Sequence, residues 1–378
     1  MQLTNAMSGS TGDPALGRGE IIKVIEGRGA ARRVPMAIHE WINAKTFGAR
    51  EPQYRQLLDK YPCDTEIIHL NIPKVFEAPA DDPSYRWLSF NNPFPPGTAL
   101  DAVSALDDWA KLDDVLADFP NPNYPGLIPA QPQSQSQSQS QPQSQPQPGG
   151  RYRIGHWWYW LFERLWSIRG MENALCDFYE NGGQVHRLFR ALTDFYKVII
   201  SRAKNELGID AIYTSDDIGM QTNTFFSMEV FREFFKPYYK ELIDHVHKLG
   251  MHFWLHACGN IKQFIPELVE AGLDVLHPIQ KHTMNEKEIA AEFGSKICIW
   301  AGLDVQRIIP YGSPEEVRRE VRFLYDTYYN RDGRFIITAG NGMTADTPYA
   351  NLEAFLDEAL RYGLEISGDK RPRLSISR

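Results

Sequence analysis

A histidine and a cysteine lie two residues apart in the segment Leu255-His256-Ala257-Cys258-Gly259-Asn260. A short apolar run, Met251 to Leu255, precedes the pair, and a helical pattern from Ile261 to Ala271 follows it. Residues two apart at the end of a β-strand point to the same side, so both side chains can face one site. Imidazole and thiolate groups suit zinc. The spacing therefore predicts either a zinc site or a buried cysteine beside a hydrogen-bonded histidine.

The composition is that of an acidic globular chain. It has 378 residues, of which 43% are hydrophobic, and a formal net charge of -8, which argues against a nucleic-acid partner. Four scattered cysteines without a CxxC pair fit a reducing compartment. No apolar run reaches the ~18 residues of a membrane span, and residues 1–16 lack the apolar core of a signal peptide. We therefore expect a cytoplasmic protein with no membrane partner.

One segment, Gln131 to Gln147, consists almost entirely of Gln, Ser and Pro and is closed by Pro148-Gly149-Gly150. It has no apolar residue to bury, so ordering it would cost entropy without compensation. We expect residues 131–150 to be a disordered insertion before the third strand, because the part that precedes them has too few core elements to form its own domain. The expected organisation is a tail at 1–18, one barrel domain at 19–366 and a tail at 367–378.

Short β-rich apolar runs alternate with helical patterns along the chain. Eight runs are predicted as strands: Val34 to His39, Glu66 to Asn71, Arg153 to Trp158, Ala211 to Thr214, His252 to His256, Val275 to Pro278, Ile297 to Gly302 and Phe335 to Ala339. The helical patterns are Tyr54 to Lys60, Ala105 to Ala117, Leu188 to Leu207, Phe226 to Leu249, Ile261 to Ala271, Glu286 to Phe293, Pro314 to Tyr328 and Pro348 to Tyr362. Such alternation implies a parallel sheet, and eight units favour an α/β fold closed into a (β/α)8 TIM barrel.

Nearly every predicted strand is followed by a polar residue that could contact a ligand. The residues predicted in this way to bind substrate are His39, Trp41, Asn71, His156, Trp158, Gln221, Gln280, Asp304 and Asn341. Each of them alone could be a cap or a turn residue. In a (β/α)8 barrel, however, all strands end on the rim where active sites lie, so their recurrence favours a site.

Three acidic residues have structural alternatives of their own. Asp216 and Asp217 follow the fourth predicted strand, where they could cap a helix or face the site. Glu163 lies among the tryptophans at 157, 158, 160 and 166, which could form a core or an aromatic pocket. A carboxylate in such surroundings needs a partner, either an arginine or a metal.

Several motifs of the chain resemble the uroporphyrinogen decarboxylase superfamily, and most of all its corrinoid-dependent methyltransferase branch. They are His256-Ala-Cys-Gly-Asn, Ser227-Met-Glu-Val-Phe-Arg-Glu-Phe-Phe-Lys-Pro, Arg32-Arg-Val-Pro, Asp216-Asp-Ile-Gly-Met-Gln, His277-Pro-Ile-Gln, Gly302-Leu-Asp, Gly312-Ser-Pro-Glu-Glu-Val, and Ala339-Gly-Asn-Gly-Met followed by Thr347-Pro-Tyr-Ala-Asn. The resemblance runs from about Gly19 to Gly363 outside the Gln/Ser/Pro segment. It implies a (β/α)8 barrel, in agreement with the strand pattern.

Porphyrin decarboxylation would need residues that the chain lacks. The resemblance implies arginines after the first strand, an aspartate after the second and a histidine in the last turn. Here these places hold His39-Glu40-Trp41, Ile68-His69-Leu70-Asn71 and Gly340-Asn341-Gly342. A negatively charged pocket holds a polyanion poorly. We therefore do not expect decarboxylation of uroporphyrinogen.

The methyltransferases of this superfamily bind zinc through a His-x-Cys pair and usually a second cysteine in the last turn. His256 and Cys258 match the pair, and Asn341 stands in place of the second cysteine. The resemblance then implies a carboxylate, Asp217 or Glu163, to complete the ligands. Such a harder ligand set suits polarisation of an ether oxygen better than binding of a free thiol.

We therefore expect zinc-dependent, O-demethylase-like methyl transfer from a methoxylated small molecule to a corrinoid carried by a separate protein. The predicted metal ligands are His256, Cys258 and Asp217, and the predicted catalytic residues are Asp217 and Glu163. Two alternatives stay open: a related lyase that acts on a different carboxylic acid, and a barrel that binds a ligand without catalysis. Metal content separates the first hypothesis from both.

Overall fold

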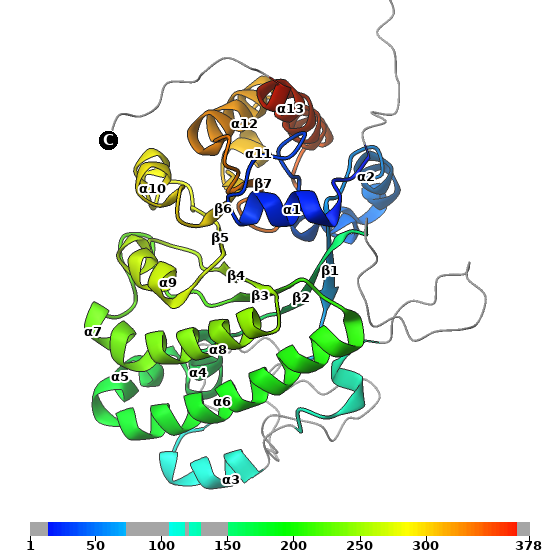
Figure 1. Cartoon of the computed structure of the whole chain (residues 1–378). Coiled ribbons are helices and arrows are strands. Elements are labelled where there is room, and N and C mark those ends of the chain that lie inside the picture. Colours follow the sequence, from blue (N-terminus) through cyan, green and yellow to red (C-terminus); the bar gives the residue numbers. More distant parts are fainter. Residues whose placement is uncertain (1–13, 73–105, 118–120, 130–149, 369–378) are drawn as a thin grey trace, which may run out of the picture. The chain divides into compact units, whose positions relative to one another are not determined.

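The computed structural model describes residues 14–72, 106–117, 121–129 and 150–368 (Figure 1). The predicted Gln/Ser/Pro insertion, except for Gly150, and most of both predicted tails lie outside these residues. The strands are β1 (Thr65–His69), β2 (Tyr152–Trp157), β3 (Ala211–Ser215), β4 (His252–His256), β5 (Val275–His277), β6 (Cys298–Leu303) and β7 (Phe335–Ala339). Their order in the sheet is their order in the chain. Parallel strands in chain order, with helices between them, confirm the predicted fold class.

The first predicted strand is wrong. In place of Val34 to His39 the structure has one parallel bridge, from Met36 to Ile337. The bridge is held by Ala37 N–H donating to Ile337 O (3.2 Å) and Ile337 N–H donating to Pro35 O (3.0 Å). Pro35 has no N–H, so it cannot extend the ladder in both directions. The chain then turns into a 3-10 helix, His39–Trp41.

Two compact units make up the chain, and unit one comprises residues 1–66, 149–152 and 285–378. Its α-helices are α1 (Arg18–Ile25), α2 (Glu51–Leu58), α10 (Glu286–Phe293), α11 (Ile308–Tyr311), α12 (Pro314–Tyr328) and α13 (Tyr349–Gly368). Strands β6 and β7 pair in parallel and are buried along their length. Helix α12 begins at Pro314 because Ser313 and Glu316 form a capping box around it.

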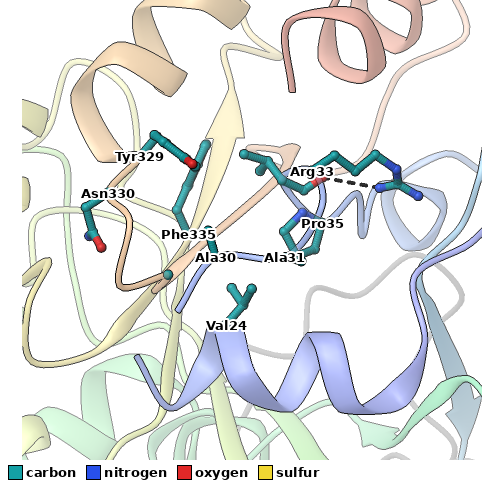
Figure 2. A pocket seen from close by; sticks show the side chains of 10 residues that line it. Val24, Ala30, Ala31, Arg33, Pro35, Tyr329, Asn330 and Phe335 are labelled. Atoms are coloured by element: carbon teal, nitrogen blue, oxygen red, sulfur yellow. Dashed lines mark hydrogen bonds between the residues drawn. The ribbon is translucent and has the colours of Figure 1, made fainter. Parts of the chain in front are cut away.

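A small hollow lies in unit one beside the amino end of β7 (Figure 2). It is open to solvent, and its empty space, the part shared with solvent included, is about 190 Å³. Its lining consists of Val24, Ala30, Ala31, Arg33, Val34, Pro35, Tyr329, Asn330, Gly333 and Phe335. The one charged member, Arg33, is fully buried and paired with Asp64 at 2.6 Å. The hollow is therefore apolar in character and lies away from the strand ends at which barrel enzymes carry out chemistry.

Unit two comprises residues 67–148 and 153–284. Its α-helices are α3 (Leu112–Ala117), α4 (Phe162–Arg169), α5 (Met171–Glu180), α6 (Gly182–Arg202), α7 (Met228–Val230), α8 (Lys236–Lys248) and α9 (Ile265–Ala271). The long helices α6 and α8 lie side by side (Figure 1) and bury one apolar face each. Among the described residues of the chain, no helix is both long and apolar enough to cross a membrane.

Strand register in unit two determines which side chains share a face. Ser215 of β3 lies opposite His256 of β4, and His256 lies opposite His277 of β5. One level earlier along the strands, His156 lies opposite Tyr213. Residues that are paired across parallel strands point to the same side of the sheet. The carboxyl ends of β3, β4 and β5 therefore present a row of polar side chains.

Candidate metal centre

Three side chains of unit two bring potential ligand atoms together at these strand ends. They are Asp217, His256 and Cys258, and one ligand atom of each lies within 4.8 Å of the others. His256 Nε2 is 3.2 Å from Cys258 Sγ and 3.6 Å from Asp217 Oδ1. The structure thus assembles the three residues that the sequence predicted as metal ligands.

The β-ladder explains why these residues meet. Asp216 N–H donates to His256 O (2.9 Å), and Ala257 N–H donates to His277 O (2.8 Å), so the parallel pairing continues past the strand ends. Asp217 and Cys258 each lie two residues beyond a member of the row Ser215, His256 and His277. Two residues along extended backbone return the side chain to the same face.

Close contacts and hydrogen bonds connect the loops after β3 and β4. Gly259 has a φ of 84°, and a Cβ on it would lie 2.4 Å from the backbone carbonyl carbon of Gly219. Only glycine permits this conformation and this approach. Cys258 N–H donates to Asp217 Oδ1 at 2.7 Å, and Asn260 N–H donates to Met220 O at 2.7 Å. Ligands carried on such loops are held in place before any metal arrives.

The donor set fits zinc. It offers one nitrogen, one sulfur and one carboxylate oxygen, which are the three ligand types that zinc accepts in proteins. His256 is only 4% exposed, and burial lowers its pKa while the charge of Asp217 raises it, so the net shift favours the neutral imidazole that a metal requires. Asp217 is 40% exposed, which leaves one side of the group open. These residues would hold the ion and leave a position for a substrate atom.

The two neighbouring aspartates have different roles. Asp216 is fully buried and accepts hydrogen bonds from Glu163 N (2.9 Å), Leu161 N (3.4 Å) and Tyr239 OH (2.7 Å). It therefore caps the first turn of α4. Burial raises its pKa to about 7, although these hydrogen bonds oppose the shift. Asp217, one residue later, faces His256 and Cys258 instead.

Glu163 lies in the first turn of α4, next to the capping aspartate. Its side chain accepts a hydrogen bond from Ser215 Oγ, and the residue is 8% exposed. Burial, followed by the charges of Asp217 and Asp216, raises the pKa of Glu163 well above its ordinary value. The carboxyl is therefore held toward its protonated form, which can donate a proton.

Aromatic rings lie beside His256. The Trp158 ring is half-buried and lies 5.9 Å from the ring of His256 and 4.4 Å from that of His156. His156 is fully buried and stacks on Tyr213 at 4.5 Å, and burial lowers its pKa to about 3. Tyr159 has a φ of 69°, a conformation that bulky residues rarely adopt, and such outliers cluster at functional sites.

The other predicted residues of unit two have mainly backbone partners. Gln280 Oε1 accepts from Gly259 N at 2.6 Å, next to Cys258. Asn71 Nδ2 donates to Gly126 O at 2.9 Å, and Gln221 is exposed in the loop after β3. Gln280 is therefore linked directly to the group around Cys258, whereas Asn71 supports a neighbouring turn.

The remaining predicted residues belong to unit one. Asp304 Oδ1 accepts from Gln306 N (2.8 Å) and Arg307 N (3.1 Å), as a turn cap does. Asn341 is exposed, and its Oδ1 accepts from Gly342 N at 2.7 Å. Trp41 is 6% exposed and lies 6.1 Å from Trp300, and burial lowers the pKa of His39. Their predicted contacts with a substrate stay predictions.

Residue-by-residue reasoning from the sequence gave no role to three contributors. Ser215 donates to Glu163, Tyr239 donates to Asp216, and His277 Nδ1 lies 2.7 Å from His256 Nδ1. For His277 a signal was present, since this histidine lies in the short predicted strand Val275 to Pro278, which follows the one that carries His256. Tyr239 comes from the middle of helix α8, where nothing in the local pattern marks it.

Comparison with known proteins supplies the relatives of this chain. It is 24% identical over 189 residues to the methylated-thiol–coenzyme M methyltransferase of Methanosarcina mazei, covering 50% of this chain and 48% of that protein. It is 25% identical over 175 residues to the methylcobamide:CoM methyltransferase MtbA of the same organism, covering 46% and 49%. The chain thus spans about half the length of the curated relatives that it matches.

A solved methyltransferase from Methanosarcina mazei superposes with a TM-score of 0.47 and 15% identity, covering 56% of this chain and 59% of that one. The sequence model of the uroporphyrinogen decarboxylase family matches residues 164–362, which include Asp217, His256, Cys258 and His277. This match covers more than half of the chain. The chain belongs to the uroporphyrinogen decarboxylase (URO-D) family.

Proposed function

We propose that this protein is a zinc-dependent methyltransferase that removes a methyl group from a methoxylated small molecule and passes it to a corrinoid on a separate protein. The observation that carries the proposal is the convergence of Asp217, His256 and Cys258, whose ligand atoms lie within 4.8 Å of one another. The named activities of the curated relatives, one of them a methylcobamide:CoM methyltransferase, support methyl transfer as the reaction class.

The composition of the donor set supports an ether rather than a thiol as substrate. Asp217 contributes a carboxylate oxygen, a harder ligand than a second thiolate. When bound in such a site, zinc supplies Lewis-acid polarisation of a substrate oxygen. Asp217, His256 and Cys258 would hold the ion, and the half-exposed side of Asp217 would leave room for the substrate.

The residues around the ligands can carry out the rest of the chemistry. Trp158 lies beside His256 and offers an aromatic face to a methoxylated ring. Glu163, held toward its protonated form, can give a proton to the oxygen that loses its methyl group. A reduced corrinoid on the separate protein would supply the methyl acceptor. Once the carbon–oxygen bond broke, the proton from Glu163 would let the substrate oxygen leave as a hydroxyl group.

Metal analysis tests the first half of this proposal. Protein purified without chelators should contain about one zinc per chain, and Cys258→Ser should lose it because a thiolate ligand is removed. Cys176→Ser is the matched control, since Cys176 is an exposed cysteine of α5 in the same unit. Wild-type protein that contains no zinc and takes none up would contradict the proposal.

Turnover tests the second half. A methoxylated benzoate, incubated anaerobically with the zinc-loaded protein and free cob(I)alamin, should yield the corresponding phenol and methylcobalamin in equal amounts. Cys258→Ser should yield neither, and Cys176→Ser should match the wild type. Zinc-loaded protein that demethylates no ether but methylates a thiol from methylcobalamin would replace the proposed substrate class with a thiol.

A further inference from the structure

A second buried histidine lies directly behind the ligand histidine. His277 is fully buried at the end of β5, and its Nδ1 is 2.7 Å from Nδ1 of His256. The two rings are tilted by 32°, with centroids 4.9 Å apart. The other ring nitrogen of His256, Nε2, faces Cys258 and Asp217. His256 therefore uses its two nitrogens on opposite sides, one toward the ligand group and one toward His277.

Proton counting assigns the hydrogen in this contact. Two ring nitrogens at 2.7 Å form a hydrogen bond only if one of them carries a proton and the other has a free lone pair. A nitrogen that binds a metal cannot carry a proton. If His256 binds through Nε2, its proton is on Nδ1, and His277 Nδ1 must be the acceptor. His277 then carries its own proton on Nε2.

We propose that His277 is a positioning residue for the metal centre: it fixes the tautomer and the ring orientation of His256 by accepting its Nδ1 proton. The inference rests on the proposed zinc site and extends it to a residue outside the ligand set. Histidine ligands of metals generally need such an acceptor, most often a carboxylate, a carbonyl or water. A neutral imidazole in that place makes the contact without adding negative charge to a buried site.

The strand register explains why His277 can fill this role. His256 and His277 are directly paired across β4 and β5, and Ala257 N–H donates to His277 O at 2.8 Å. The same segment supports the second ligand, because Gln280 Oε1 accepts from Gly259 N at 2.6 Å. Residues 277–280 thus contact Ala257 and Gly259, the neighbours of His256 and Cys258, without being ligands themselves.

Zinc affinity of matched variants tests the assignment. His277→Phe keeps a ring but removes the acceptor, and His277→Leu is a second variant without an acceptor. His277→Asn keeps an acceptor, its Oδ1, close to the position of Nδ1. The controls are His245→Phe and His245→Asn, because His245 is a part-buried histidine of α8 whose hydrogen bonds go to Ser201 and Lys197 of α6.

The affinities are measured by competition with a chromophoric chelator, after thermal melting of the zinc-free proteins has shown that each variant is folded. We expect His277→Phe and His277→Leu to weaken zinc binding by about 10- to 100-fold, the usual effect of losing the partner of a ligand histidine. His277→Asn should restore most of that affinity, and both His245 variants should bind zinc as the wild type does.

A nitrogen-detected NMR spectrum of the zinc-loaded proteins gives a readout that a merely structural role would not move. The His256 Nδ1 proton should be protected from exchange in the wild type and in His277→Asn, and it should exchange rapidly in His277→Phe. Equal zinc affinity in wild type and in both acceptor-free variants would overturn the assignment while leaving the proposed function intact. An equal loss of zinc affinity in His277→Asn, His277→Phe and His277→Leu would also overturn it, because the presence of a hydrogen-bond acceptor would then make no difference. Failure of the wild type to bind zinc would instead remove the proposed function.

Discussion

Each unit of this protein contains an aspartate at the centre of a polar network, and the two networks differ in what remains open. In unit one, Asp64 is fully buried and accepts from Arg33 Nη1 (2.6 Å), Arg33 Nη2 (2.8 Å), Leu16 N (2.7 Å) and Met36 N (2.6 Å). In unit two, Asp217 accepts one hydrogen bond, from Cys258 N, and its side chain is 40% exposed.

The difference separates a structural carboxylate from one that can act as a ligand. Four donors occupy Asp64, among them a guanidinium that cancels its charge, so nothing remains for a metal. The neighbours of Asp217 are a neutral imidazole and a thiol, which are themselves potential ligands. Asp64 links the backbone at Leu16 and at Met36 to the side chain of Arg33. Leu16 is buried, although it lies within the segment predicted as a tail.

The largest effect should come from removing the structural carboxylate. Asp64→Ala leaves the buried guanidinium of Arg33 without its partner, which typically costs about 3–5 kcal/mol. Urea denaturation followed by tryptophan fluorescence should show this loss. Glu51→Ala is the control, because its ion pair with Arg55 is solvent-exposed and should contribute less than ~1 kcal/mol. An equal loss of unfolding free energy in both variants would show that the buried ion pair contributes no more to stability than the exposed one.

The next effect concerns Asp216 and depends on pH. Burial raises the pKa of this carboxyl to about 7 from its ordinary value of 3.8, so the folded protein keeps a proton that the unfolded chain releases. The stability linked to that proton is fully present below pH 3.8 and is lost as the pH rises through about 7. Asp216→Asn cannot titrate and should lose this dependence.

The free energy of unfolding is obtained from denaturation curves at each pH. Its difference between wild type and Asp216→Asn should therefore change by roughly 1–3 kcal/mol between pH 4 and pH 7. Both proteins are measured free of zinc, so that metal release does not add its own pH dependence. The buried His156 titrates in both proteins and cancels in the difference. Asp216→Asn also removes a charge that raises the pKa of Glu163, and this effect adds to the difference in the same direction. Parallel curves for the two proteins would mean that Asp216 is ionised across this range.

Much of the fold followed from the sequence, because each strand after the first is a short run of β-rich apolar residues. The first predicted strand failed at Pro35, which cannot donate to a ladder. Helix α4 was missed for a different reason: seven of its eight residues are buried, so no polar face reveals a helical period. Helix α5 follows at once, after Gly170 with a φ of 74°.

The candidate site followed from the sequence as far as local spacing reaches. The two-residue spacing from His256 to Cys258 was enough to predict a shared face, and the resemblance added Asp217. The sequence could not show which of Asp216 and Asp217 caps α4 and which faces His256 and Cys258. The answer depends on which side chain reaches the first turn of α4. His277 was missed since its contact with His256 arises from strand register, which no single segment encodes.

The smallest expected change in stability gives the sharpest test of the contrast between the two carboxylates. In zinc-free protein, Asp217→Ala removes one hydrogen bond from a part-exposed side chain, a loss that should not exceed about 1 kcal/mol. It also removes a charge that raises the pKa of the buried Glu163, and that relief favours the folded state. The lost hydrogen bond and the removed charge have opposite effects on stability, so the urea midpoint should hardly move. Zinc affinity in the same preparation should fall by more than ~100-fold, because a charged ligand is gone. Destabilisation as large as that of Asp64→Ala, together with unchanged zinc binding, would make Asp217 a structural carboxylate like Asp64 and would remove it from the metal centre.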